Sequence, residues 1–264
     1  MNNTFNLRRS GLLLKKTLLE RPIQMFGFTG MLLAIVLIIY ALAKTFLGIG
    51  AAQNLAFIWG LAGGGCFLAS FVFGYFSTNA LGSSYLTLPA SHLEKWLCGI
   101  LIVGLLYPVI FFLFFRIIDA TFVAIFHHSL DPSAPFFKEQ YESVFLFNFN
   151  GVIAWKVYPI FLFLTGAMLI GSLYFNKVSF IKTGIVICIV CIGSFWLNWL
   201  FAEITFGTIN EAAPFNHVSV PVGKEEGSIE LPEKASWIFR FSISYVFTIL
   251  LWVLAFVRLR EKEF

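Results

Sequence analysis

The sequence predicts an all-α integral membrane protein with six transmembrane helices and an N-terminal amphipathic interfacial helix. Hydrophobic residues make up 59% of the 264 residues and charged residues only 12%, against about 25% charged in an average soluble domain. The mean hydropathy is +0.85. Six stretches reach the roughly 20 apolar residues that a helix needs to cross a bilayer. These observations place the chain among membrane proteins.

The first predicted element is a cytoplasmic interfacial helix within residues 1–21. Four small or apolar residues share one side of it at helical spacing, namely Leu7, Gly11, Leu14 and Leu18. Four cations cover much of the rest, namely Arg8, Arg9, Lys15 and Lys16. One interpretation is a helix that lies in the membrane interface, where anionic lipid attracts its cations. The alternative is a positively charged topology anchor. Arg21-Pro22 predicts a break before the first span.

The six predicted spans make residues 1–264 one membrane domain. They cover approximately residues 23–47, 55–76, 96–126, 152–175, 184–206 and 237–257. The third is overlong at about 30 residues and contains Pro108, which predicts either a kink or a helix that projects past the membrane. The second contains the glycine run 63–65, which favours close helix approach together with Gly60, Ala62 and Ala69.

Lys and Arg beside the spans predict the orientation, because positive residues favour the cytoplasmic side. With the N-terminus inside, eleven lie on the inner side: Arg8, Arg9, Lys15, Lys16, Arg21, Lys95, Lys177, Lys182, Arg258, Arg260 and Lys262. Three lie outside: Lys138, Lys224 and Lys234. Both termini are therefore predicted to be cytoplasmic, in a multi-pass protein of the plasma (inner) membrane. The long outer loops are 127–151 and 207–236, and "HVSVPV" in the second is a weak strand pattern.

Familiar catalytic and nucleotide-binding patterns do not occur in the sequence. It has no G-x-x-x-x-G-K-[ST], H-E-x-x-H or G-x-S-x-G. The net charge is +4, but the basic residues do not cluster on one polar face, as they do in proteins that bind nucleic acid. No nucleic-acid partner is therefore predicted. The four cysteines are interpreted as small packing residues, although Cys188 and Cys191 form a C-x-x-C that redox or metal chemistry would also use. His127, His128 and His217 lie in the outer loops without a recurring ligand spacing, so no metal site is predicted.

Ionisable residues inside the spans are costly and often functional. Arg116 and Asp119 are three residues apart and can pair on one helix face. Asn198 and Glu203 lie in the outer part of the fifth span. These four residues are candidates for a polar pathway along which a substrate moves. The alternative is structural pairing near the interface, with nearby tryptophans as membrane anchors.

The stretch "SSYLTLPASHLEKWL", residues 83–97, joins the second and third spans. Ser91 and Glu94 form an S-x-x-E capping box that starts the third helix. Pro89 stops the preceding segment from continuing as helix, which predicts a cytosolic elbow. Leu86 and Leu88 are expected to lie on the cytosolic side without membrane to bury them. An exposed apolar patch of this kind indicates a partner.

"YLTLPASHLEKWLCGILI" resembles the first cytoplasmic loop of type-2 ABC transporter permeases, the membrane subunits of ABC exporters. In that family a Leu-Pro-x-Ser element forms a short coupling helix that docks on a separate ATPase subunit. Leu88, Pro89 and Ser91 match the element, and His92 stands where a stronger base often follows. The layout is also similar, with a basic N-terminal helix, six spans and a long external region before the last span. In relatives that region contains short re-entrant helices; here it is longer and more polar.

The resemblance implies a permease that works as a homodimer or heterodimer in membrane lipid and moves a substrate outward. ATP and Mg would bind the ATPase subunit, so this chain would be no enzyme and hold no cofactor. The implied ATPase-coupling loop, 83–95, contains Leu86, Leu88, Pro89, Ser91, His92, Glu94 and Lys95. One alternative is a membrane-bound enzyme at the outer face, with His127, His128, Glu203 and His217 as candidate residues. Another is a non-transporting membrane scaffold or sensor. The substrate is not predicted.

Overall fold

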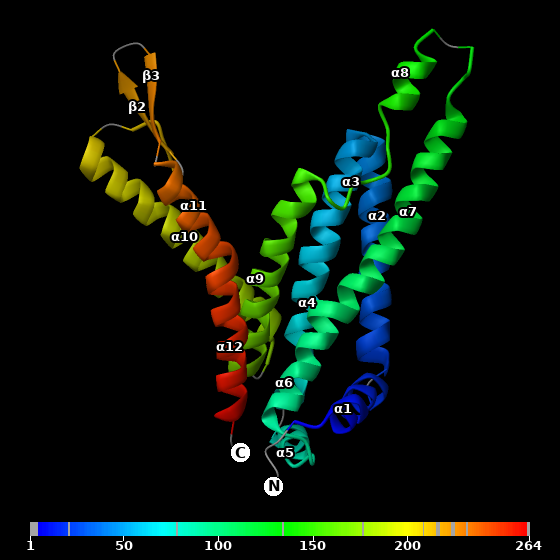
Figure 1. Ribbon diagram of the computed structural model, residues 1–264, viewed down its shortest axis with the longest axis vertical. Coiled ribbons are helices and arrows are strands. Elements are labelled where there is room, and N and C mark those ends of the chain that lie inside the picture. The colour runs from blue at the N-terminus through cyan, green and yellow to red at the C-terminus, as the bar shows by residue number, and fades with distance from the viewer. Residues whose placement is uncertain are drawn as a thin grey trace.

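A computed structural model describes residues 5–20, 22–77, 79–133, 135–175, 177–207, 209–214, 217–222, 225–230 and 232–262. Arg21 and Lys224, which enter the orientation prediction, lie outside the described residues. Six helices are long and apolar enough to cross a membrane, as expected of a multi-pass membrane protein. Both termini lie at one end of the molecule (Figure 1). We call this end the near end and the opposite end the far end.

The six predicted spans are confirmed as helices, several of them with π-helical segments. In chain order they are η1 (Ile23–Gly27) with α2 (Phe28–Leu47); α3 (Ile49–Ile58), η2 (Trp59–Gly63) and α4 (Gly64–Val72); α6 (His92–Ile100), η4 (Leu101–Leu106) and α7 (Tyr107–Ser129); α9 (Val152–Tyr174); α10 (Ser179–Phe206); and α11 (Glu233–Phe241), η5 (Ser242–Val246) and α12 (Phe247–Arg260). The shorter elements are α1 (Leu7–Glu20), the 3-10 helix η3 (Gly74–Ser77), α5 (Asn79–Leu86) and α8 (Phe137–Glu142).

The connection between the first two spans is shorter than predicted. The second span begins at Ile49 rather than near residue 55, because a single residue, Gly48, turns the chain between α2 and α3. Its φ of 85° is a left-handed conformation that glycine adopts without steric cost. The third span is one 38-residue stretch of helix, His92–Ser129. At 1.5 Å per residue it exceeds the roughly 30 Å hydrocarbon core, so projection past the membrane is the expected consequence.

The N-terminal helix α1 forms as predicted, but a different face is buried. Its buried residues are Ser10, Leu13 and Thr17, with Leu14 and Leu18 packed against the core beside them. Leu7 and Gly11, expected on the apolar side, are exposed. The difference arises because α1 packs against the rest of the protein, and that contact selects the face that is buried.

A small antiparallel sheet stands at the far end in addition to the helices. Its strands are β1 (Glu211–Ala213), β2 (His217–Val222) and β3 (Glu225–Glu230), in the order β1-β2-β3. The strand predicted at "HVSVPV" is confirmed as β2, which pairs His217 with Glu230 and Val218 with Ile229. In the described part of 207–236 the chain therefore forms this sheet and the start of α11, where the resemblance implied re-entrant helices.

The helix α3–η2–α4 is the centre of the bundle, with 67% of its most apolar stretch buried against 6% for α10. Small residues allow this packing. A Cβ atom on Gly64 would collide with the Tyr107 hydroxyl, and that hydroxyl donates a hydrogen bond to the carbonyl oxygen of Gly60. The prediction that the glycine run permits close helix approach is confirmed.

Two arms diverge from the near end toward the far end (Figure 1). One contains α2, α3, α4 and α7, the other contains α10, α11 and α12, and α9 lies between them. Tryptophans join the arms. Trp96 Nε1 donates to the carbonyl oxygen of Trp252 at 3.0 Å, and Trp252 Nε1 donates to that of Leu162 at 2.9 Å. These bonds tie α6, α12 and α9 together where the arms converge.

Candidate functional site

The elbow, residues 79–95, is built by a helix cap at the near end. The short helix α5 ends at Leu86, a turn follows, and α6 begins at His92. Ser91 has extended backbone and accepts a hydrogen bond from the Glu94 N–H at 3.2 Å. The Glu94 Oε2 accepts one from the Ser91 N–H at 2.8 Å in return. The predicted capping box is therefore confirmed, and it fixes where the third span starts.

Glu94 has a second role that the sequence did not reveal. Its Oε1 accepts hydrogen bonds from the Asn6 N–H at 2.7 Å and from Arg9 Nη2 at 2.9 Å and Nε at 3.3 Å. The carboxylate is fully buried, whereas Arg9 is partly exposed. Hydrogen bonds that involve charged groups are about twice as strong as neutral ones. Glu94 therefore holds α1 against the elbow while it caps α6.

Lys95 caps the other helix of the elbow. Its side chain is buried, and Nζ donates to the carbonyl oxygen of Leu86, the last residue of α5, at 2.9 Å. A cation at the C-terminus of a helix satisfies a free carbonyl and opposes the negative end of the helix dipole. The ammonium also lies 5.5 Å from the centre of the Tyr85 ring. Burial raises the pKa of Tyr85, so its phenol stays neutral.

The exposed surface of the elbow differs from the predicted one. Leu86 and Leu88 are half-buried and pack against the core, and Glu94 and Lys95 are 0% and 1% exposed. None of the four presents a free side chain, because the leucines pack inward and the charges are used to cap helices. Besides the small residues Ala80, Ser83 and Ser84, the side chains that do face outward are Leu81, Thr87, Pro89, His92 and Leu93. We call these five residues the elbow surface.

Asp119 organises the far half of the same long helix. It is fully buried, and Oδ1 accepts hydrogen bonds from Tyr40 Oη and Gln53 Nε2, both at 2.8 Å. Oδ2 accepts one from the Phe147 N–H at 2.7 Å. Gln53 Nε2 also donates to the carbonyl oxygen of Phe145 at 2.8 Å. The carboxylate thus joins the first three spans to the far-end segment 144–150.

Arg116 is a weaker partner of Asp119 than their three-residue spacing suggested. The predicted pair exists, with Arg116 Nη1 at 3.9 Å from Asp119 Oδ2. The neutral donors Tyr40 and Gln53 are closer, and the guanidinium instead lies 4.3 Å from the centre of the Phe149 ring. Tyr40 and Gln53 were missed because they lie in other spans, and one sequence does not reveal which polar residues meet across helices.

The four candidate pathway residues do not come together. Asn198 Nδ2 donates to the carbonyl oxygen of Ala212 at 3.2 Å, which ties α10 to β1, and Glu203 is exposed on the same helix. Arg116 and Asp119 lie on α7, in the other arm (Figure 1). The geometry therefore gives two separate polar sites rather than one lining. The Arg116–Asp119 contact on α7 is the pairing that the structural alternative expects, and a pathway role for these residues stays a prediction.

Of the far-end histidines, His127 packs against the segment 141–144, and His128 is exposed. His127 Nε2 lies 3.2 Å from the carbonyl oxygen of Tyr141 and 3.1 Å from that of Val144, and its ring stacks on Tyr141. This joins α8 to α7. Among the described residues no three His, Cys, Asp or Glu side chains are grouped as a metal site would require. Of the free cysteines, Cys66 and Cys98 are buried and Cys188 and Cys191 are exposed on α10.

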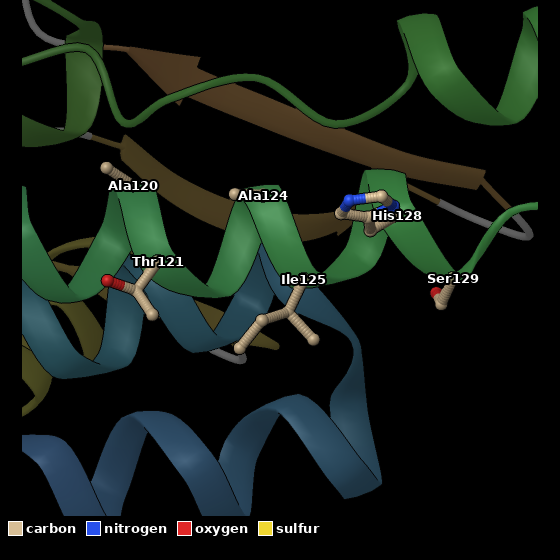
Figure 2. Close-up of a pocket in the computed structure, with 6 residues that line it drawn as sticks. All are labelled: Ala120, Thr121, Ala124, Ile125, His128 and Ser129. Carbon is tan, nitrogen blue, oxygen red and sulfur yellow. The ribbon is translucent and has the colours of Figure 1, made fainter.

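The far half of α7 carries a shallow surface depression. The residues that line it come from this one helix: Ala120, Thr121, Ala124, Ile125, His128 and Ser129. Figure 2 shows these side chains along one side of α7. Binding sites for small molecules usually bring together polar groups from several elements, and this depression does not. The elbow is therefore the stronger candidate for function.

Comparison with known proteins adds no relative to this picture. No family model, curated protein or solved structure matches the chain. The function must therefore be argued from the residues and geometry of the elbow and the spans.

Proposed function

We propose that this chain is the permease subunit of an ABC-type exporter and moves a substrate outward across the plasma (inner) membrane. The energy comes from ATP hydrolysed by a separate ATPase subunit docked on the elbow. The observation that carries the proposal is the elbow itself: a short helix, a turn with Pro89 and a capped span, at the end that holds both termini. Leu88, Pro89 and Ser91 provide the coupling-helix element there.

In this proposal the near end faces the cytoplasm, where ATP is available. The excess of Lys and Arg at that side supports this orientation. ATP and Mg bind the partner subunit, and the permease contributes no catalytic residue and no cofactor. Two permeases, identical or different, form the transporter, because ABC exporters of this type work in pairs. The largely exposed α10 leaves a long apolar surface for lipid or for the second permease.

The elbow surface makes the contact, and the buried elbow residues keep its shape. Leu81 and Leu93 are 41% and 39% exposed, and Pro89 and His92 lie between them in the sequence. Ser91, Glu94 and Lys95 cap the two helices behind this surface. A displacement of the docked ATPase is passed to α6 and α1 together, because both are bonded to Glu94. It reaches α12 through the Trp96–Trp252 hydrogen bond.

The proposal expects a P-loop ATPase to be encoded beside this chain, and the test is co-purification of the chain with that ATPase. The wild-type chain, co-expressed with that ATPase, is expected to retain it through affinity and size-exclusion steps. The double substitution His92→Asp/Leu93→Asp places two uncompensated carboxylates in the contact, which should weaken the complex at least about tenfold. Phe136→Asp is the matched control, because Phe136 is exposed at the far end. Failure of the wild type to bind, or equal binding by the double variant, would contradict the proposal.

A further inference from the structure

The helix α1 has two faces with different surroundings. The inward face buries Ser10, Leu13 and Thr17 against the protein. The outward face leaves Leu12 and Leu19 exposed at 61% and 58%. The two leucines lie seven residues apart, which is two helical turns, so they share one stripe. Apolar side chains in such a stripe need a cover that the described protein does not supply.

The same outward face is basic. Arg8, Lys15 and Lys16 are exposed on it, and none forms an ion pair among the described residues. On a helix in the membrane interface, leucines enter the acyl boundary, and long Lys and Arg side chains on the same face can extend to the lipid phosphates. Each Lys or Arg near the surface of an anionic membrane contributes about 1 kcal/mol to the free energy of binding.

The position of α1 in the chain identifies lipid as the cover. The helix ends at Glu20, and the first candidate span begins at Met25. Its packing partner is the start of the third span, where Glu94 binds Arg9 and the Asn6 N–H. Because both spans enter the membrane at this level, the outward face of α1 lies at the membrane surface. A soluble partner would have to displace lipid to reach the leucines.

Glu94 connects this face to the elbow. Arg9 is the neighbour of Arg8 on α1, and its guanidinium is bonded to the carboxylate that caps α6. Whatever fixes the position of α1 therefore also fixes the position of Arg9 relative to Glu94. A change in lipid charge at Arg8, Lys15 and Lys16 thus has a direct route of hydrogen bonds to residues 91–94.

We propose that the outward face of α1 binds the anionic headgroups of lipid in the near-end leaflet through Arg8, Lys15 and Lys16. The ion pair of Arg9 with Glu94, which we call the clamp, transmits the effect of this binding to the elbow. Anionic lipid then stabilises the ordered elbow, whichever partner docks on it. The inference goes beyond the proposed function and is independent of the ATPase.

The experiment is amide hydrogen exchange of the purified full chain in nanodiscs. One set contains phosphatidylcholine alone and the other adds phosphatidylglycerol. If each cation contributes about fivefold, exchange in residues 7–20 should slow by at least about tenfold in the anionic discs. Exchange in residues 83–95 should slow with it. The far-end segment 144–150 should not change, and it also reports that each variant is folded.

Three variants separate the parts of the inference. Arg8→Gln/Lys15→Gln/Lys16→Gln should abolish the lipid effect on both segments. Lys177→Gln/Lys182→Gln/Arg260→Gln removes the same charge from other exposed near-end positions and should leave the effect intact. Glu94→Gln should keep the slowing in α1 and lose it in the elbow.

Two results would overturn the inference. Equal exchange of α1 in both kinds of disc would rule out the lipid site. The same conclusion would hold if exchange in α1 slowed only when an ATPase was added. Slowing in α1 that never reaches residues 83–95 in the wild type would remove the connection through Glu94.

Discussion

Two buried carboxylates lie on one 38-residue helix, and they are satisfied in different ways. Glu94 at the near end has a guanidinium nitrogen at 2.9 Å. Asp119 in the far half has its nearest cation at 3.9 Å and takes its close hydrogen bonds from neutral groups. Both are 0% exposed. A buried charge is costly unless it is paired or hydrogen-bonded. Glu94 has a cation among its close donors, whereas the close donors of Asp119 are all neutral.

Because of this difference, the contact at Glu94 can open, whereas the contacts at Asp119 stay closed. The partner of Glu94 is Arg9, which is partly exposed and lies on a surface helix, so water or lipid can compete for it. The partners of Asp119 belong to the first two spans and to Phe147, and Tyr40 itself is fully buried. The near end can therefore rearrange when something binds there, while the far half keeps the first three spans together. That distribution suits a protein driven from its near end.

The largest expected effect is that of Asp119→Ala. It leaves the Tyr40 hydroxyl and the Phe147 N–H without their acceptor in a buried site, and it removes one of two acceptors from Gln53. Each buried donor left without an acceptor costs about 1–3 kcal/mol, so the two together should cost about 2–6 kcal/mol. The free energy of unfolding in mixed micelles measures it. A loss below about 1 kcal/mol would show that Asp119 does not hold the first three spans together.

Glu94→Ala should cost less, about 2–3 kcal/mol, because it removes a helix cap and a charged hydrogen bond but leaves Arg9 able to reach water. A double-mutant cycle with Arg9→Ala isolates the pair, and the expected coupling is about 1–2 kcal/mol. The Asn6 N–H loses its acceptor in Glu94→Ala whether or not Arg9 is present, so this loss cancels in the cycle. Additive effects of the two substitutions would mean that the clamp contributes no energy of its own.

Tyr107→Phe tests the region between the two carboxylates. It removes only the hydrogen bond to the carbonyl oxygen of Gly60 and keeps the ring that packs on the central helix. The expected loss of stability is about 1 kcal/mol, the usual net value of one such bond. A loss as large as that of Asp119→Ala would mean that the contact between the second and third spans, and not the carboxylate, holds the far half together.

Arg116→Ala should have the smallest effect, at most about 1 kcal/mol, because the guanidinium is 39% exposed and lies 3.9 Å from Asp119. Its contact with the Phe149 ring adds little at an exposed site. The same unfolding measurement applies. An effect equal to that of Asp119→Ala would mean that the Arg116 cation is the main partner of Asp119, and the contrast with Glu94 would then be wrong.

The sequence predicted what depends on local pattern. Apolar length located all six spans, the S-x-x-E spacing located the start of α6, and the glycine run indicated where helices approach closely. The spacing of Arg116 and Asp119 also predicted their pairing. Each of these signals is local to one segment of the chain, where helix length and helix geometry decide which residues cross the membrane and which groups meet.

The features that were missed depend on contacts between distant segments. Arg9 and Glu94 are 85 residues apart, and Tyr40 and Asp119 are 79 apart. A single sequence carries no signal for such pairs. The burial of Leu86, Leu88 and Lys95 was missed for the same reason, because the packing of α5 against the bundle decides which side of the elbow faces outward.

The most direct test of the central claim, that the elbow surface docks an ATPase subunit, is site-specific photocrosslinking. A photoreactive residue replaces His92 in one sample and Phe136 at the far end in a matched one. Each is co-expressed with the P-loop ATPase that the proposal expects to be encoded beside this chain. The account predicts an adduct between the ATPase and position 92 and none from position 136. An intact complex that gives no adduct from position 92, or equal adducts from both positions, would contradict it.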